Sequence, residues 1–208
     1  MSPKKATMVF FSMKFSKINN LLLALIILIN GYVILAPFFP AAIFDLQNHQ
    51  AKQQQLEKEI KPTSKPNNST QTPQPNQVII PSMLLDQPIL EGPTINRYAI
   101  LNNGIWRWPL ASTPDKGGNT VLIGHRFTYT NPKGVFYFLN KVQLGDEIGV
   151  IWNNEKYLYK VVSVSQVPPT DMAIQNNTSN PELTLFTCTP LLLPKDRLVI
   201  VAYLESKS

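Results

Sequence analysis

The sequence predicts an all-β domain, a sandwich or a barrel, behind a single apolar helix near the N-terminus. From Val78 onward, short apolar runs are broken by turns at intervals of about 8 to 12 residues, which is typical of sandwiches and barrels. Residues 18–44 carry no charge, and the polar, proline-rich stretch 45–77 separates them from the apolar runs. Together the three observations predict a tethered β domain over residues 78–208.

The composition fits one globular domain with an appendage, as a length of 208 residues suggests. The 18 prolines against 9 glycines indicate loops and linkers. The net charge of +6 would permit nucleic-acid binding, but the lysines gather in the N-terminal tail and the linker. Because no aromatic–basic interleaving marks a nucleic-acid face, we predict no nucleic-acid partner. The single cysteine excludes an intramolecular disulfide and leaves one thiol to explain.

The N-terminal segment predicts a membrane anchor. Four lysines lie within residues 1–17, ahead of the uncharged segment 18–44. Roughly 20 residues at 1.5 Å each cross a hydrocarbon core of about 30 Å, and 18–44 is long enough. The positive-inside rule then predicts a cytoplasmic tail and a single-pass signal-anchor, with the rest of the chain outside the cell. A signal peptide cleaved after Ala36 or near Ala41 is the alternative, and the uninterrupted length disfavours a buried core helix.

The linker 45–77 predicts a flexible tether. Residues 45–60 are polar and favour a short solvated helix, in which His49 is an exposed residue without a ligand role. Residues 61–77 are rich in Pro, Asn, Gln and Thr and have little to bury, so they predict a disordered or polyproline-like chain. The β domain is then held near the membrane but is free to swing.

Eight apolar runs define the expected elements of the β domain. Asn153-Asn154 joins two of them as a hairpin turn. Within 156–164, the alternation of Tyr157, Tyr159 and Val161 predicts one buried strand face. No helical periodicity extends beyond Val135–Lys141. The runs span residues 78–81, 88–90, 98–101, 119–123, 147–152, 156–164, 183–187 and 198–204.

Three residues that carry chemistry fall at the ends of predicted strands. Cys188 ends the run 183–187, His125 follows the run 119–123, and Arg197 opens the run 198–204. Taken alone, Cys188 would favour a buried structural thiol, since free cysteine is among the most buried residue types. A lone cysteine with a distant histidine is also a nucleophile candidate, and the placement of all three at strand ends favours that interpretation.

These residues resemble the sortases, the cysteine transpeptidases of bacterial cell surfaces. The resemblance rests on the TLxTC pattern at Thr184–Cys188, the GHR at Gly124–Arg126, and Arg197 nine positions after the cysteine. It covers about residues 78 to 205, and it implies a closed eight-stranded β-barrel seated on the membrane. An L,D-transpeptidase would instead present its cysteine in a Ser-x-Gly-Cys-x-Arg context, which Phe186–Thr189 lacks.

The resemblance also implies roles for these residues. Cys188 is the nucleophile, His125 protonates the leaving amine and deprotonates the incoming one, and Arg197 holds the oxyanion or the substrate backbone. Arg126 is a rival to Arg197, for which a structural salt bridge is expected. Residues that would contact substrate or support the oxyanion are Thr187 and Thr189 beside the cysteine, and Pro168, Thr170, Met172 and Ile174 in the long connection 166–181.

The function implied is cleavage of an LPxTG-like sorting signal after its threonine, with transfer of the acyl group through a thioester to an amine. The amine belongs to a peptidoglycan precursor, and the expected role is anchoring of surface proteins, like sortase classes A, D and E. A pilin-polymerising class C enzyme, which joins a pilin lysine, is the alternative. The linker shows no Asp-Pro-aromatic lid element, and no second apolar segment follows the barrel.

A second alternative is a non-catalytic surface module, which would be expected to have lost Cys188, His125 or Arg197. The sequence predicts no cofactor, and it predicts no obligate metal because the carboxylates of 78–205 show no clustered ligand pattern.

Overall fold

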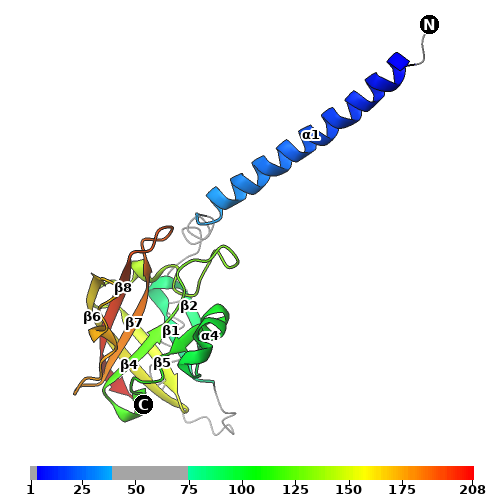
Figure 1. Ribbon diagram of the computed structural model, residues 1–208. Coiled ribbons are helices and arrows are strands. Elements are labelled where there is room, and N and C mark those ends of the chain that lie inside the picture. The colour runs from blue at the N-terminus through cyan, green and yellow to red at the C-terminus, as the bar shows by residue number, and fades with distance from the viewer. Residues whose placement is uncertain (1–3, 39–74) are drawn as a thin grey trace.

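The computed structural model describes residues 4–38 and 75–208, which form one long helix and a closed β-barrel (Figure 1). The helix α1 spans Lys4–Leu35. The second α-helix described, α4, spans Arg97–Asn103. The strands are β1 (Gln77–Ile80), β2 (Leu85–Leu90), β3 (Ile105–Arg107), β4 (Asn119–Ile123), β5 (Glu147–Trp152), β6 (Glu155–Val167), β7 (Glu182–Thr189) and β8 (Asp196–Lys207).

The barrel closes in the strand order β1-β2-β3-β4-β7-β8-β6-β5. The pairs β2–β3 and β4–β7 are parallel, and the other neighbours are antiparallel. The closed eight-stranded barrel expected from the sequence is confirmed. Full closure leaves no free sheet edge, so a strand end at the barrel rim can present a side chain while its backbone stays paired.

The predicted hairpin turn is confirmed at Asn153-Asn154. Both asparagines have positive φ, 51° and 65°, and Trp152 pairs with Glu155 directly across the turn. A two-residue loop with two positive φ angles matches the right-handed twist of the flanking strands, and asparagine tolerates this conformation well. Tyr157 and Tyr159 are buried, as the alternation along this strand predicted.

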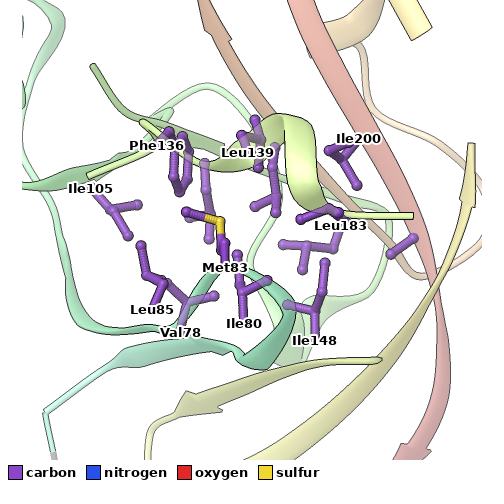
Figure 2. Close-up of a cluster of buried hydrophobic side chains, with 14 of the residues drawn as sticks. Val78, Ile80, Met83, Leu85, Ile105, Phe136, Leu139, Ile148, Leu183 and Ile200 are labelled. Carbon is purple, nitrogen blue, oxygen red and sulfur yellow. The ribbon is translucent and has the colours of Figure 1, made fainter. Parts of the chain in front are cut away.

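The inward faces of the strands form one continuous apolar core (Figure 2). Val78, Ile80, Ile148, Leu183 and Ile200 contribute from strands on all sides of the barrel. The segment 135–141, beyond which the sequence showed no longer helical periodicity, forms turns followed by a short 3₁₀-helix at Leu139–Lys141. Its residues 136–139 are all buried, so this segment covers the core at one end of the barrel.

One predicted strand is wrong. Residues 98–101 belong to the helix α4, and Tyr98 is 65% exposed. The reason is topological, because parallel neighbours such as β2 and β3 need a crossover connection that returns the chain to the starting end of the sheet. The helix α4 lies within that crossover and is capped by Gly104, whose N–H donates to the carbonyl of Ile100 at 3.1 Å.

The helix α1 contains one stretch, Lys17–Leu35, that is long and apolar enough to cross a membrane, with a mean hydropathy of 2.2 and no residue of that window buried. It ends at Leu35, whereas the sequence analysis extended the segment to residue 44. Pro37 explains the early end, since helices usually stop at or before the residue that precedes a proline. The rest of the predicted segment, the linker up to Gln74 and His49 lie outside the described residues.

Candidate active site

The strand β7 has two chemically distinct faces. Leu183 and Leu185 point into the barrel core, whereas Phe186 belongs to a separate apolar cluster on the outer face. Because side chains alternate along a strand, Cys188 shares the outer face with Phe186. Its thiol is free and exposed, which fits a nucleophile rather than the buried structural cysteine considered above.

Arg197 lies directly opposite Cys188. The two residues are cross-strand partners in the antiparallel β7–β8 pair, so their side chains leave the barrel on the same face. The guanidinium carbon of Arg197 lies 5.0 Å from the ring centre of Phe186, a cation–π contact that orients the side chain along β7. Its Nε is buried and has no hydrogen-bond partner among the described residues.

His125 reaches the same place from β4. Ile123 at the end of β4 pairs in parallel register with Phe186, and His125 and Cys188 each follow two residues later. The Gly124 N–H donates to the carbonyl of Phe186 at 3.5 Å, which continues this register. His125 is half-buried, and burial lowers its pKa from the ordinary value because the charged imidazolium loses hydration.

The backbone around His125 is tightly constrained. A Cβ at Gly124 would lie 2.7 Å from a methyl group of Val135 and 2.8 Å from the ring of Phe136, so only glycine fits there. The His125 carbonyl accepts a hydrogen bond from the Phe136 N–H at 3.0 Å. The glycine of the GHR pattern therefore lets the buried segment 135–139 pack against the strand end that carries the histidine.

Arg126 points into a network of protein partners. Its Nη1 donates to the Thr189 hydroxyl at 2.8 Å and its Nε to the Tyr137 carbonyl at 3.4 Å. Burial lowers its pKa from the usual arginine value. The structure gives these hydrogen bonds where the sequence analysis expected a salt bridge. Arg126 thus ties the segment after β4 to the end of β7.

Thr187 and Thr189 lie on the face of β7 opposite to the thiol. Both side chains are buried, and the Thr187 hydroxyl donates to the Gly124 carbonyl at 2.8 Å. The direct contact with substrate that the sequence analysis expected for these threonines is not the arrangement observed, because strand alternation turns them inward. Both instead hold the neighbouring segment, through Gly124 and through Arg126.

A second apolar cluster lies on the outer side of the barrel, on the face of β7 that carries Cys188. Its floor is formed by Val121, Phe186 and Val199, one from each of the adjacent strands β4, β7 and β8, and these three side chains are buried beneath the other members of the cluster. Of the loop residues proposed from the sequence, only Ile174 packs against this floor, while Pro168, Thr170 and Met172 are exposed. The other partly buried members of this cluster are Trp108, Ala111, Ile123, Val167 and Val201.

The sequence analysis missed several of these floor residues, although a signal was present. Val121 and Ile123 alternate on the same strand face as His125, so they were predictable as outward-facing apolar residues beside the histidine. The anchor of the loop 168–181 was also missed. Buried Asn119 donates through Nδ2 to the carbonyls of Ile174 and Asn176, at 3.3 and 3.0 Å, and this holds Ile174 against the floor.

A cavity of about 250 Å³ lies beside His125, between the end of α4 and the segment after β4. Its lining is mostly uncharged and polar, and it includes His125, Asn102, Asn103, Thr128 and Asn131. The histidine therefore borders two different environments, the apolar floor on the side of β7 and a polar cavity on the side of α4. In the described part of the chain no group of three His, Cys, Asp or Glu residues is placed to hold a metal ion.

Fold and site together define a β-barrel protein with a cysteine, a histidine and an arginine gathered at one rim. The sortase domain model matches residues 78–205, more than half of the chain, and the protein belongs to the sortase family. Sortase SrtE1 of Streptomyces coelicolor is 31% identical over 136 residues, which cover 58% of this chain and 37% of that protein. The chain spans between 37% and 56% of the length of the curated relatives it matches.

Solved structures give the same result for the fold. The Sortase D5 transpeptidase of Clostridium perfringens has a TM-score of 0.56 and 27% identity, covering 79% of this chain and 95% of that chain. Sortase E1 from Streptomyces coelicolor, solved with a tripeptide in the active site, has a TM-score of 0.55 and 25% identity, covering 64% and 88%. Sortase C1 of GBS Pilus Island 1 has a TM-score of 0.56 and 26% identity, covering 63% and 64%.

Proposed function

We propose that this protein is a membrane-anchored cysteine transpeptidase, with Cys188 as nucleophile, His125 as general acid and base, and Arg197 as the cation at the oxyanion. The observation that carries the proposal is the convergence of three strand ends. Cys188 and Arg197 are direct cross-strand partners, and the parallel β4–β7 register brings His125 beside them. This register and the alternation along β7 and β8 support one shared outer face for the three side chains, on which the Cys188 thiol is exposed.

The first half of the reaction makes a thioester. The Cys188 thiol gives its proton to His125, the resulting thiolate attacks the carbonyl carbon of the scissile amide, and the carbonyl oxygen becomes an oxyanion in the tetrahedral intermediate. His125, as imidazolium, gives its proton to the leaving amine as the C–N bond breaks. The guanidinium of Arg197, the cross-strand partner of Cys188, would stabilise this oxyanion through its charge and its planar set of N–H donors.

The second half transfers the acyl group. An acceptor amine attacks the thioester carbonyl, His125 takes a proton from that amine, and the C–S bond breaks to release the Cys188 thiolate. We assign the acceptor to the polar cavity beside His125, since its amide and hydroxyl groups suit a peptide-like amine and His125 forms part of its lining. The donor and the acceptor then approach the histidine from opposite sides.

The proposed donor is an LPxTG-like sorting signal, cleaved after its threonine. The apolar cluster beside Cys188 supports this choice, because its partly exposed members offer the leucine and proline of such a signal an apolar contact near the scissile bond. Ile174 would cover these residues from the loop, and Pro168, Thr170 and Met172 would form the outer wall. The tripeptide held in the active site of sortase E1 is in keeping with a peptide donor.

The proposed biological role is to anchor secreted proteins to a peptidoglycan amine at the cell surface. The apolar stretch Lys17–Leu35 supports a single-pass membrane anchor, and the lysines before it support a cytoplasmic N-terminus with the barrel outside. Pilin polymerisation, with a pilin lysine as acceptor, is the second candidate, favoured by the similarity to Sortase C1 of GBS Pilus Island 1.

The test uses the detergent-solubilised full chain and its Cys188→Ala variant. Each is incubated with a Leu-Pro-x-Thr-Gly peptide library and with either triglycine or a lysine blocked at its α-amine, and products are read by mass spectrometry. Cleavage after threonine with triglycine adducts, absent from the variant, is the expected result. Adducts with lysine alone would favour pilin polymerisation. A folded chain that forms neither thioester nor adduct across the library would contradict the enzymatic proposal and favour a surface module.

A further inference from the structure

Two loops at the active-site end of the barrel expose apolar side chains that belong neither to the core nor to the apolar floor. The loop between β7 and β8, residues 190–195, carries Leu192 and Leu193, which are 46% and 81% exposed. Leu191 packs against the core and fixes the base of this loop, so its two neighbours remain at the surface. Two adjacent exposed leucines on one short loop are a candidate contact surface.

The loop after β4, residues 126–133, adds an aromatic pair at the same end. Phe127 packs against the core, and its ring meets that of Tyr129 edge to face, with the ring centres 5.1 Å apart. Tyr129 itself is 57% exposed. Tyrosines are enriched at membrane–water interfaces, because the ring is apolar and the hydroxyl is polar.

Both loops lie at the end of the barrel that α1 approaches (Figure 1). A chain of hydrogen bonds connects them. The Tyr137 hydroxyl donates to the carbonyl of Pro37, just after α1, and the Tyr137 carbonyl accepts from Arg126. Arg126 in turn donates to Thr189, the residue before the leucine loop. Beside Pro37, Phe38 is 56% exposed, so apolar side chains continue from the end of α1 toward the barrel.

The charge of this end also fits a bilayer. Residues 126–133 contain Arg126 and Lys133 with no acidic residue, and residues 190–195 contain Lys195 with none. Lys133 and Lys195 are exposed. Basic side chains beside apolar ones favour contact with anionic lipid headgroups, and the attraction is strongest within a Debye length of the surface.

We propose that the loops 126–133 and 190–195 form a second membrane contact, here called the lipid rim. Leu192 and Leu193 enter the boundary of the acyl chains, Tyr129 lies at headgroup level, and Lys133 and Lys195 contact lipid phosphates. This inference rests on the proposed membrane anchor and is independent of transpeptidation. The linker alone predicted a domain that swings freely near the membrane. With the lipid rim, the active-site end of the barrel instead faces the bilayer, where membrane-bound donors and acceptors lie.

The single cysteine of the chain makes a direct test possible. In the full-length Cys188→Ala background, Leu193→Cys is labelled with the environment-sensitive dye NBD and reconstituted into phosphatidylcholine–phosphatidylglycerol vesicles. The matched control is Leu110→Cys. Leu110 is 79% exposed and lies near Ser112, which bonds to Asn119 at the start of β4, the end opposite to His125.

The expected result is a blue-shifted emission for the label at position 193 and severalfold stronger quenching by nitroxides on lipid tails than at position 110. Flotation of the protein with the vesicles is measured first. Without co-flotation the anchor fails, and the lipid rim fails with it. With co-flotation, equal water exposure of both labels overturns the lipid rim alone. A label at 193 that responds to a sorting-signal peptide in detergent, and not to lipid, also overturns it and assigns the loop to the peptide site.

A second experiment checks the consequence for catalysis. The Leu192→Gln, Leu193→Gln double variant should cleave a soluble peptide in detergent as the unchanged chain does, while cleavage of a lipid-anchored peptide in vesicles falls severalfold. Thermal unfolding confirms that the variant is folded. Equal losses on soluble and lipid-anchored peptides would contradict the lipid rim, because they would show that the leucines act on the active site directly. Failure of the proposed transpeptidase would leave the NBD result unaffected, since the labelled chains lack Cys188.

Discussion

Two arginines lie near the thiol, and the structure treats them in opposite ways. Arg126 donates to the Thr189 hydroxyl and to the Tyr137 carbonyl. Arg197 packs over the ring of Phe186 and keeps a buried Nε without a partner in the described chain. The protein satisfies hydrogen-bond donors of Arg126, whereas the buried Nε of Arg197 has no acceptor in the described chain. A buried donor without an acceptor costs free energy, and a ligand that accepts from it would remove this cost. This difference supports the proposal that Arg126 stabilises the fold and that Arg197 acts on the substrate.

The largest effect is expected at Arg197. Arg197→Ala should lower kcat/KM by about a hundredfold to a thousandfold, the usual cost of removing one oxyanion donor. Arg197→Lys should recover little, because the ammonium keeps the charge but loses the planar fork of donors. Steady-state cleavage of a sorting-signal peptide measures both. Arg97→Ala, at an exposed position of α4, is the control. Activity within threefold of the unchanged chain in Arg197→Ala would contradict the role of this cation.

Arg126 should behave in the opposite way. Arg126→Ala leaves the Tyr137 carbonyl and the Thr189 hydroxyl without a partner, and each unsatisfied buried group costs about 1–3 kcal/mol of unfolding free energy. The activity per folded molecule should change little. Chemical denaturation gives the stability. A double-mutant cycle with Thr189→Val should show coupling, since the two side chains share one hydrogen bond. Additive losses would show that the contact contributes little.

Thr187 tests how the strand end that carries His125 is held. Thr187→Val keeps the shape but removes the hydrogen bond to the Gly124 carbonyl, so His125 loses part of its support. We expect kcat to fall about tenfold, while KM for the peptide changes less, because small misplacements of a reacting group reduce rate more than binding. Thr187→Ser, which retains the hydroxyl, should restore most of the rate. A rise in KM at constant kcat would instead indicate that Thr187 contacts the donor.

The smallest effect is a shift in pH dependence caused by the burial of His125. Burial lowers the pKa of His125 from its ordinary value of 6.5, so the acid limb of kcat/KM should lie below pH 6.5. The lowered pKa of His125 also makes the free energy of unfolding depend on pH. Between the lowered folded pKa and 6.5 the unfolded chain binds more protons, so the free energy of unfolding falls as the pH drops through this window.

His125→Gln provides the control for this pH dependence. The variant should remove the pH dependence of the unfolding free energy that His125 causes. NMR titration gives the pKa of His125 directly, and its imidazole signal can be assigned because the chain has only 2 histidines. A folded-state pKa above 6.5 would contradict the effect of burial. His49→Gln, which leaves His125 in place, should retain the full dependence.

Much of the fold was predictable because its signals are local. The hairpin at Asn153-Asn154 follows from a two-residue turn that tolerates positive φ, and the strand 119–123 is bounded as the apolar run predicted. The helix α4 was not predictable in this way. The apolar run 98–101 is too short to distinguish a strand from a helix by its pattern. These residues are helical because they lie in the crossover between the parallel strands β2 and β3.

The sequence by itself determined the apolar helix, every strand except β3, and the three candidate catalytic residues, because hydropathy, turn residues and short motifs act over a few positions. Only the tertiary structure decided which arginine is bonded, which face Thr187 takes and which side chains form the apolar floor. These outcomes depend on contacts such as Thr187 to Gly124 and Arg126 to Thr189, each 63 residues apart. The closure of the barrel sets that pairing, and a one-residue change in register would turn every side chain of β7 to the other face.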